Sequence, residues 1–251
     1  MPVTAPTRTT RRGPLAALAV TIALAGCAGE PASDGPAEPL CPTLPAGVSG
    51  SPRTIPATVA MVNALVQAGS APLTIPCFLS RLERPMGVSA VNSEFSLQPG
   101  DGPRSPRMFA FLGELELILS VTPVGAAKDF LELAEYPTPL RSIKAEISFP
   151  VTAAVLPAEP YERIRSGTGT VCGGCHRDER PAPSVTVATA FESGVFKPRP
   201  EDLVPLPSVR EHQAACDPKV EPFRCAMFEA LLGHGAVHEG QFPEDAPTIF
   251  D

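Results

Sequence analysis

The chain has 251 residues, a formal net charge of -7, 32 prolines, no tryptophan and only 6% aromatic residues. The negative charge argues against nucleic acid as a partner, because polyanions bind basic surfaces. Abundant proline and scarce aromatic side chains predict a loop-rich protein with modest cores, and the residues from about 56 onward are enough for one domain of ordinary size or two small ones.

Residues 1–26 have the features of an export signal. An apolar run over residues 15–25 is too short to span a bilayer as a stable helix. A positively charged stretch precedes it, formed by Arg8, Arg11 and Arg12. Loss of these three arginines with the signal would change the net charge from -7 to -10 (-7 minus 3).

The apolar run ends in the sequence Leu-Ala-Gly-Cys27. This sequence resembles the lipobox of bacterial lipoproteins. The resemblance implies cleavage before Cys27 and attachment of lipid to its thiol. Because a lipobox product carries several acyl chains, we expect a stable membrane anchor. Ala28 follows in place of Asp, which by the same resemblance implies the outer membrane, facing the periplasm or the surface, if the cell is Gram-negative.

Residues 27–55 read as a flexible tether, because they are rich in Pro, Ala, Gly and Ser and show little hydrophobic periodicity. A helix is predicted over residues 57–68, where Val59, Val62, Leu65 and Val66 fall on one face and Gly69 follows as a cap.

Residues 56–158 are predicted to form an antiparallel β domain of sandwich type, which makes the protein mainly β. Apolar and polar residues alternate over 115–121 and over 143–149, as expected for half-buried strands. Weaker strand candidates lie at Leu73–Leu82, Val88–Val91, Met108–Leu112 and Phe130–Leu133.

Residues 159–251 are predicted to form a smaller helix-and-loop segment. One or two helical turns are expected at Tyr161–Arg165, an irregular Pro-rich stretch over 181–210, and a helix at Pro222–Leu232. This segment contains Cys172-Gly173-Gly174-Cys175-His176. Two thiols three residues apart can both reach the vinyl groups at one haem edge, and the adjacent imidazole can then bind the iron.

At this motif the chain resembles c-type cytochromes over about 15 residues. The resemblance implies one covalent haem, with thioethers at Cys172 and Cys175 and His176 as the proximal iron ligand. It implies single-electron transfer with a redox protein partner, and no enzymatic activity. The Met-Pro that usually follows in small cytochromes is absent.

The distal ligand therefore has to be sought elsewhere. His234 lies between two glycines just after a predicted helix, and we take it as the distal candidate. His238 is a second loop histidine, His212 lies in a polar stretch, and Met227 is expected in a helix core.

Four cysteines remain as disulfide candidates, and we expect the pairs Cys41–Cys77 and Cys216–Cys225. Three other interpretations stay open. Cys172 and Cys175 could hold zinc with Cys216 and Cys225 or with His176. They could form a thiol redox pair. The chain could also be a disulfide-stapled binding or structural lipoprotein without haem.

Overall fold

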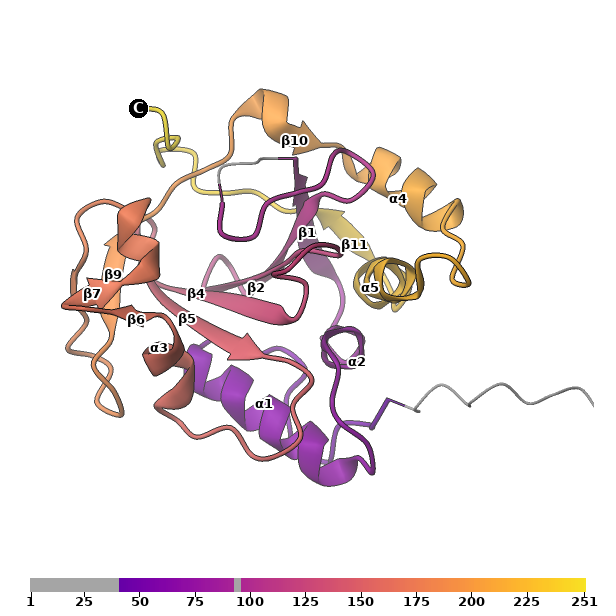
Figure 1. The fold of residues 1–251 in the computed structure, drawn as a ribbon, viewed down its shortest axis with the longest axis horizontal. Helices are drawn as coiled ribbons and strands as arrows, with labels where there is room; N and C mark the ends of the chain where they lie inside the picture. Colours follow the sequence, from indigo (N-terminus) through magenta and orange to yellow (C-terminus); the bar gives the residue numbers. More distant parts are fainter. Residues whose placement is uncertain (1–40, 93–95) are drawn as a thin grey trace, which may run out of the picture. The chain divides into compact units, whose positions relative to one another are not determined.

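The alternating segments of the sequence form the centre of the sheet in the computed structural model, which describes residues 41–92 and 96–251 (Figure 1). The export signal, Cys27 and most of the predicted tether lie outside these residues. The five long strands follow one another as neighbours and pair antiparallel: β1 (Met86–Val91), β2 (Arg107–Leu112), β3 (Leu117–Val121), β4 (Phe130–Thr138) and β5 (Arg141–Ser148).

Short strands from the second half of the chain extend this sheet at both ends. The order is β10-β1-β2-β3-β4-β5-β9-β8, and β11 pairs with β1 in the parallel direction. The prediction of a mainly β fold is confirmed, but the predicted sandwich is wrong, because the described strands lie in one nine-stranded sheet and a separate two-stranded ribbon. The short strands are β8 (Arg180–Pro181), β9 (Phe191–Gly194), β10 (Leu203–Val204) and β11 (Val237–Glu239) in the sheet, and β6 (Arg165–Ser166) and β7 (Gly169–Thr170) in the ribbon.

One face of the sheet is apolar and is covered by helices. Leu119, Leu133 and Ala145 occupy neighbouring positions on β3, β4 and β5 and are almost fully buried. They belong to the same core as the buried face of α1 (Ile55–Ala68). Figure 1 shows α1 along β4 and β5, with α2 (Ile75–Leu79) beside α5 (Pro222–Leu232) at the other end of the sheet. The remaining helices are α3 (Glu159–Arg163), α4 (Leu206–Ala214) and the 3-10 turns η1 (Val171–Gly174) and η2 (Pro200–Asp202).

Two sequence predictions need correction. The segment Leu73–Leu82, a strand candidate, forms α2, because Thr74 caps the helix and Pro76 fits its first turn. The stretch 181–210, predicted to be irregular, supplies β8, β9, β10 and the start of α4. Strand β9 pairs with β5, so the sheet continues across the predicted boundary between residues 158 and 159.

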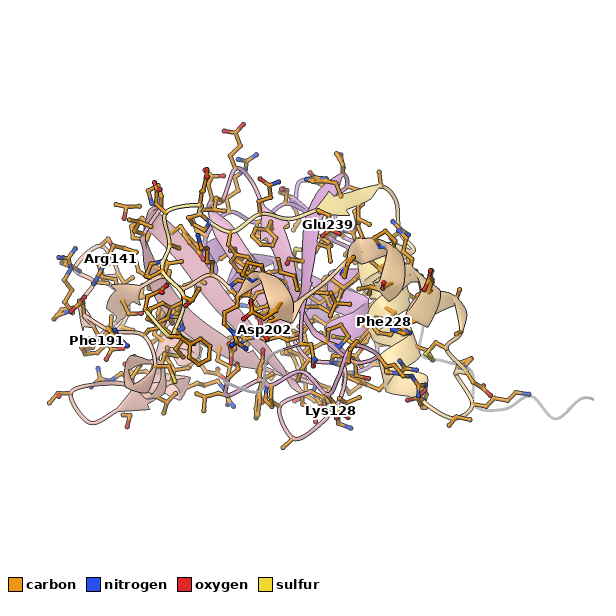
Figure 2. The ribbon with its side chains drawn as sticks, turned by 90° about the horizontal axis from the view of Figure 1, so that it is seen from above. Lys128, Arg141, Phe191, Asp202, Phe228 and Glu239 are labelled. Atoms are coloured by element: carbon orange, nitrogen blue, oxygen red, sulfur yellow. A yellow bond between two sulfur atoms is a disulfide. The ribbon has the colours of Figure 1, made fainter. Side chains whose placement is uncertain are left out.

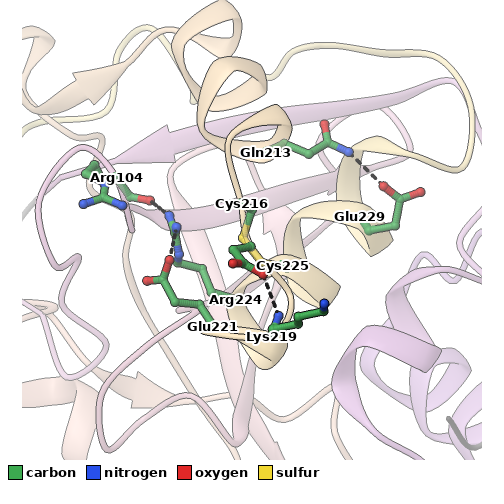
Figure 3. The surroundings of a disulfide bond; sticks show 9 residues. Arg104, Gln213, Cys216, Lys219, Glu221, Arg224, Cys225 and Glu229 are labelled. Carbon is green, nitrogen blue, oxygen red and sulfur yellow. Dashed lines mark hydrogen bonds and ion pairs between the residues drawn. A yellow bond between two sulfur atoms is a disulfide. The ribbon is translucent and has the colours of Figure 1, made fainter. Parts of the chain in front are cut away.

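Both predicted disulfides are confirmed. Cys41 and Cys77 are bonded, with their Cα atoms 5.1 Å apart, and Cys216 and Cys225 are bonded at 5.6 Å. The second bond joins the end of α4 to α5 (Figure 3). Beside it the buried Arg224 donates to the carbonyl oxygen of Arg104 at 2.7 Å, which ties α5 to the loop before β2. In residues 41–92 and 96–251 no helix has both the length and the apolar character needed to cross a membrane.

Candidate functional site: a cavity beside the Cys-x-x-Cys-His turn

The Cys-x-x-Cys-His sequence forms a tight turn directly after β7. The hydroxyl of Thr170 caps η1 by accepting a hydrogen bond from the backbone N–H of Cys172 at 3.2 Å. The backbone N–H groups of Cys175 and His176 both donate to the carbonyl oxygen of Cys172, at 3.1 and 2.8 Å. This turn therefore fixes the two cysteines and the histidine relative to one another through backbone bonds alone.

Glu179 holds the start of this turn. Its carboxylate accepts the backbone N–H of Thr170 at 2.8 Å and the Thr170 hydroxyl at 2.5 Å. A Cβ atom at Gly173 would lie 2.7 Å from the same carboxylate, whereas one at Gly174 would meet nothing within 4 Å. Gly173 is thus needed for packing against Glu179, and Gly174 leaves open space beside the turn.

A cavity of about 190 Å³ lies between this turn and the second face of the sheet. Its floor consists of the alternate positions of β2–β5 that point away from the helical core. Its far wall is the C-terminal segment 242–250, which we call the strap. Apolar lining residues are Leu97, Phe109, Ile118, Ala134, Ile164, Val195, Phe196, Phe242 and Ile249, and polar ones include Arg107, Glu132, Lys144, Glu146, Lys197, Arg199 and Asp202.

The strap is attached at the rim by backbone and side-chain contacts. The backbone N–H of Lys197 donates to the carbonyl oxygen of Pro247 at 2.9 Å, and Arg177 donates to the backbone oxygen of Asp251 at 2.9 Å. The guanidinium of Arg199 lies 4.5 Å from the ring centre of Phe250. Asp202, labelled at the centre of Figure 2, accepts from Arg199 at 2.9 Å. The strap is therefore tied to Lys197 and Arg199, which line the cavity themselves.

His176 lines the cavity and has a fixed orientation. Its Nδ1 donates to the carbonyl oxygen of Gly194 at 2.8 Å, and its ring stacks on Phe196 with centroids 5.3 Å apart. Burial, with the positive charge of Lys144 adding to it, lowers the pKa of His176 to about 3. The imidazole is therefore neutral at pH 7, with the proton on Nδ1 and the lone pair on Nε2. A histidine that binds a metal usually has this arrangement.

Cys172 and Cys175 line the same cavity and are both free thiols. Cys172 is half-buried and Cys175 is exposed. Burial raises the pKa of the Cys172 thiol to about 11. Reactive cysteines have a lowered pKa, because the thiolate is the nucleophile. The surroundings of Cys172 therefore argue against the thiol redox interpretation.

The polar residues on the floor are mostly paired with one another. Arg107 donates to the carboxylate of Glu132 at 2.5 Å and to the Ser120 hydroxyl at 2.6 Å. Glu146 pairs with Arg163 at 3.2 Å. Lys144 differs, because its ammonium forms no hydrogen bond or ion pair with the described residues, and burial lowers its pKa to about 8.

The other sequence candidates lie away from this cavity. His234 is exposed just after α5 and does not line the cavity, and the structure brings no second histidine or methionine to the described lining. His238 is exposed on β11, His212 is on α4, and Met227 is fully buried in the core as expected.

The four-cysteine zinc set is not formed, because two of its members, Cys216 and Cys225, are bonded to each other. Across the described ranges, no group of three or more His, Cys, Asp and Glu residues is placed to hold a metal ion.

Sequence reasoning missed the residues that build the walls. Lys144 and Glu146 were recognised only as the polar half of an alternating strand. Phe196 and Gly194 lie in a Pro-rich stretch with no periodic pattern. The alternating pattern of the strands predicted the polar face that forms the cavity floor. It gave no information about which segments cover that face.

Comparison with known proteins gives no relative. No protein-family model, no curated protein and no solved structure matches the chain.

Proposed function

We propose that the mature chain is an exported lipoprotein, anchored through Cys27, that carries one covalent haem c and transfers single electrons. Cys172 and Cys175 would form the two thioethers, and His176 would be the proximal iron ligand. When bound, the haem iron alternates between the ferrous and ferric states and so carries one electron.

One observation carries the proposal: the three motif residues line the same largely apolar cavity, and His176 is already held by Gly194. A Cys-x-x-Cys-His that occurred by chance would have no reason to lie against such a cavity. The donor chemistry also fits, because a neutral imidazole bonded at Nδ1 keeps Nε2 for a metal.

The residues of the site have separate roles in this proposal. The Gly194 carbonyl orients His176 and increases the basicity of its ring. The apolar walls, with Phe109 and Phe242, exclude water from the iron, which affects the reduction potential. Arg107, Lys197 and Arg199 supply positive charge for the carboxylates that a haem carries. The predicted export fits covalent attachment, since a haem lost outside the cell membrane would not be recovered.

Electron transfer requires only weak docking of a haem edge to a partner. The expected charge of the mature chain is negative, which would favour a basic redox protein as partner.

A second candidate function follows from the same cavity. The chain would be a disulfide-stapled lipoprotein that binds an apolar small molecule without haem. The apolar lining and the high pKa of the Cys172 thiol, which disfavours reaction, support this alternative.

The two candidates separate in one expression experiment. The full chain is produced in a bacterium with cytochrome c maturation machinery, extracted with detergent, and examined by absorption spectroscopy before and after denaturation. The haem proposal predicts a Soret band that stays with the denatured chain in wild type and is lost in Cys172→Ala/Cys175→Ala. His176→Ala is expected to retain attached haem with an altered spectrum.

The matched control is Cys216→Ala/Cys225→Ala, which removes the same number of cysteines outside the cavity lining and is expected to retain haem. A colourless wild-type protein would reject the haem proposal. It would leave the binding lipoprotein as the better account.

A further inference from the structure

Lys144 differs from the other charged residues on the cavity floor, because none of the described residues pairs with it. It lines the cavity from β5, yet its ammonium forms no hydrogen bond or ion pair with any residue in the described ranges. Lys197, which also lines the cavity, instead donates to the carbonyl oxygen of Glu244. A half-buried amine without a partner is costly, so a partner absent from the described chain is to be expected.

The other cavity side chains that could bind a metal are already engaged. The carboxylates of Glu132, Glu146 and Asp202 each pair with an arginine, at 2.5, 3.2 and 2.9 Å. Burial raises the pKa of Tyr136, so its phenol keeps its proton. With no second histidine or methionine in the described lining, Lys144 is the remaining nitrogen donor besides His176.

The strand register places Lys144 near His176 on the cavity floor. His176 is held at Gly194, which is paired with Arg141 on β5. Lys144 lies three residues further along the same strand, which corresponds to about 10 Å. Both side chains line the cavity, and the charge of Lys144 acts on the His176 imidazole, so the two nitrogens face the same space.

We propose that Lys144 is the distal ligand of the haem iron, opposite His176, and so replaces the sequence candidate His234. The inference rests on the proposed function, because it requires a haem in the cavity. A neutral amine offers the lone pair that a sixth ligand needs, and an apolar site favours the neutral form. With both axial positions filled, the site suits electron transfer and does not bind small ligands.

Two substitutions at this position separate ligation from simple charge pairing. Lys144→Ala removes both the charge and the donor. Lys144→Arg keeps the charge, but a guanidinium does not lose its proton in proteins and so cannot bind the iron. Lys219→Ala is the matched control, since it removes an exposed lysine that does not line the cavity. Each protein is produced as the full chain with maturation machinery, and attached haem is measured by intact mass.

The readout is the spin state of the ferric protein, measured by absorption and electron paramagnetic resonance, together with cyanide binding. We expect wild type and Lys219→Ala to be low-spin. Both Lys144 variants are expected to become high-spin and to bind cyanide readily, with attached haem unchanged. Wild type that is high-spin, or Lys144 variants that stay low-spin, would overturn the inference and leave the proposed function intact. A chain without attached haem would overturn both. A high-spin Lys144→Ala protein together with a low-spin Lys144→Arg protein would also overturn the inference. The positive charge at position 144 would then be enough to keep the haem low-spin without ligation by the amine.

Discussion

On one face of the central strands the side chains are Leu119, Leu133 and Ala145, and on the other they are Ser120, Glu132 and Glu146. We call the first the core face and the second the cavity face. The core face packs against helices and supplies stability. The cavity face is covered by the strap, the motif turn and neighbouring segments such as 195–202, and a cavity lined by charged side chains remains there. Neighbouring residues of one strand therefore serve opposite purposes.

The cysteines also differ between the helical side and the cavity side of the sheet. Among the six cysteines in the described ranges, the four outside the motif are oxidised in two disulfides, and Cys77 is buried in the core. The two beside the cavity are free. Disulfide bonds therefore stabilise the helical side, whereas the two cysteines beside the cavity have free thiols that can react with a haem.

Truncation of adjacent residues on β3 tests this contrast most strongly. Leu119→Ala on the core face is expected to lower the free energy of unfolding by about 2–5 kcal/mol, because a closed cavity remains. Ile118→Ala on the cavity face should cost less than half as much, since its side chain already borders open space. Chemical denaturation of both variants measures the difference. Equal losses would contradict the division into two faces.

Removal of either disulfide is expected to have the next largest effect. The sequence separation is 36 residues for Cys41–Cys77 and 9 for Cys216–Cys225. Loop-closure entropy then gives a stabilisation of about 4 kcal/mol for the first and about 2.5 kcal/mol for the second. Double alanine variants, compared by denaturant unfolding, should rank in that order. The reverse order would show that the bond between α4 and α5 has a larger role than its loop length implies.

Lys144 makes the stability of the cavity face depend on pH. In the folded chain its pKa is about 8 against a usual 10.5. Between these values the unfolded chain binds more protons, so the free energy of unfolding rises with pH, on the order of 1–3 kcal/mol in total. The haem-free background Cys172→Ala/Cys175→Ala removes the competing thiols. Adding Lys144→Met to it should flatten the rise between pH 8 and 10.5. Parallel curves of unfolding free energy against pH for the two proteins would mean that Lys144 is not buried.

The smallest expected effect is local and concerns the motif turn. Glu179→Gln weakens two hydrogen bonds to Thr170, which should cost about 1 kcal/mol because charge-assisted bonds become neutral. Amide hydrogen exchange of Thr170 and Cys172 should accelerate, while the core strands keep their protection. Unchanged exchange would mean that Glu179 does not hold the turn.

The sequence predicted the strands well where apolar residues recur at every second position, and poorly where they do not. Residues 117–121 and 143–148 are both strands, although burial alternates along most of β5 and every residue of β3 is buried. The segment 73–82 was misread because its apolar run is short. Its buried residues Ile75, Phe78 and Leu79 have helical spacing, which ten residues hardly distinguish from a strand. Strands β8 and β10 have two residues each, too few for any pattern.

The sequence predicted only those residues of the candidate site that lie close together in the chain. Cys172, Cys175 and His176 are close in sequence, so their motif is visible in the sequence itself. Phe196, Lys144 and Phe242 come from three distant segments, and only the folded sheet brings them to one cavity. His234 was chosen for its glycine neighbours, but a flexible loop gives no information about direction, and the structure places it away from the cavity.

Peptide mapping of the mature protein tests the central claim most directly. The full chain, matured with haem supplied, is digested without reduction, and each cysteine-containing peptide is weighed. We predict that one haem is found on the peptide that contains Cys172 and Cys175, with the other four cysteines in the pairs 41–77 and 216–225. A peptide that carries two unmodified thiols, or a Cys172–Cys175 disulfide, would contradict the account.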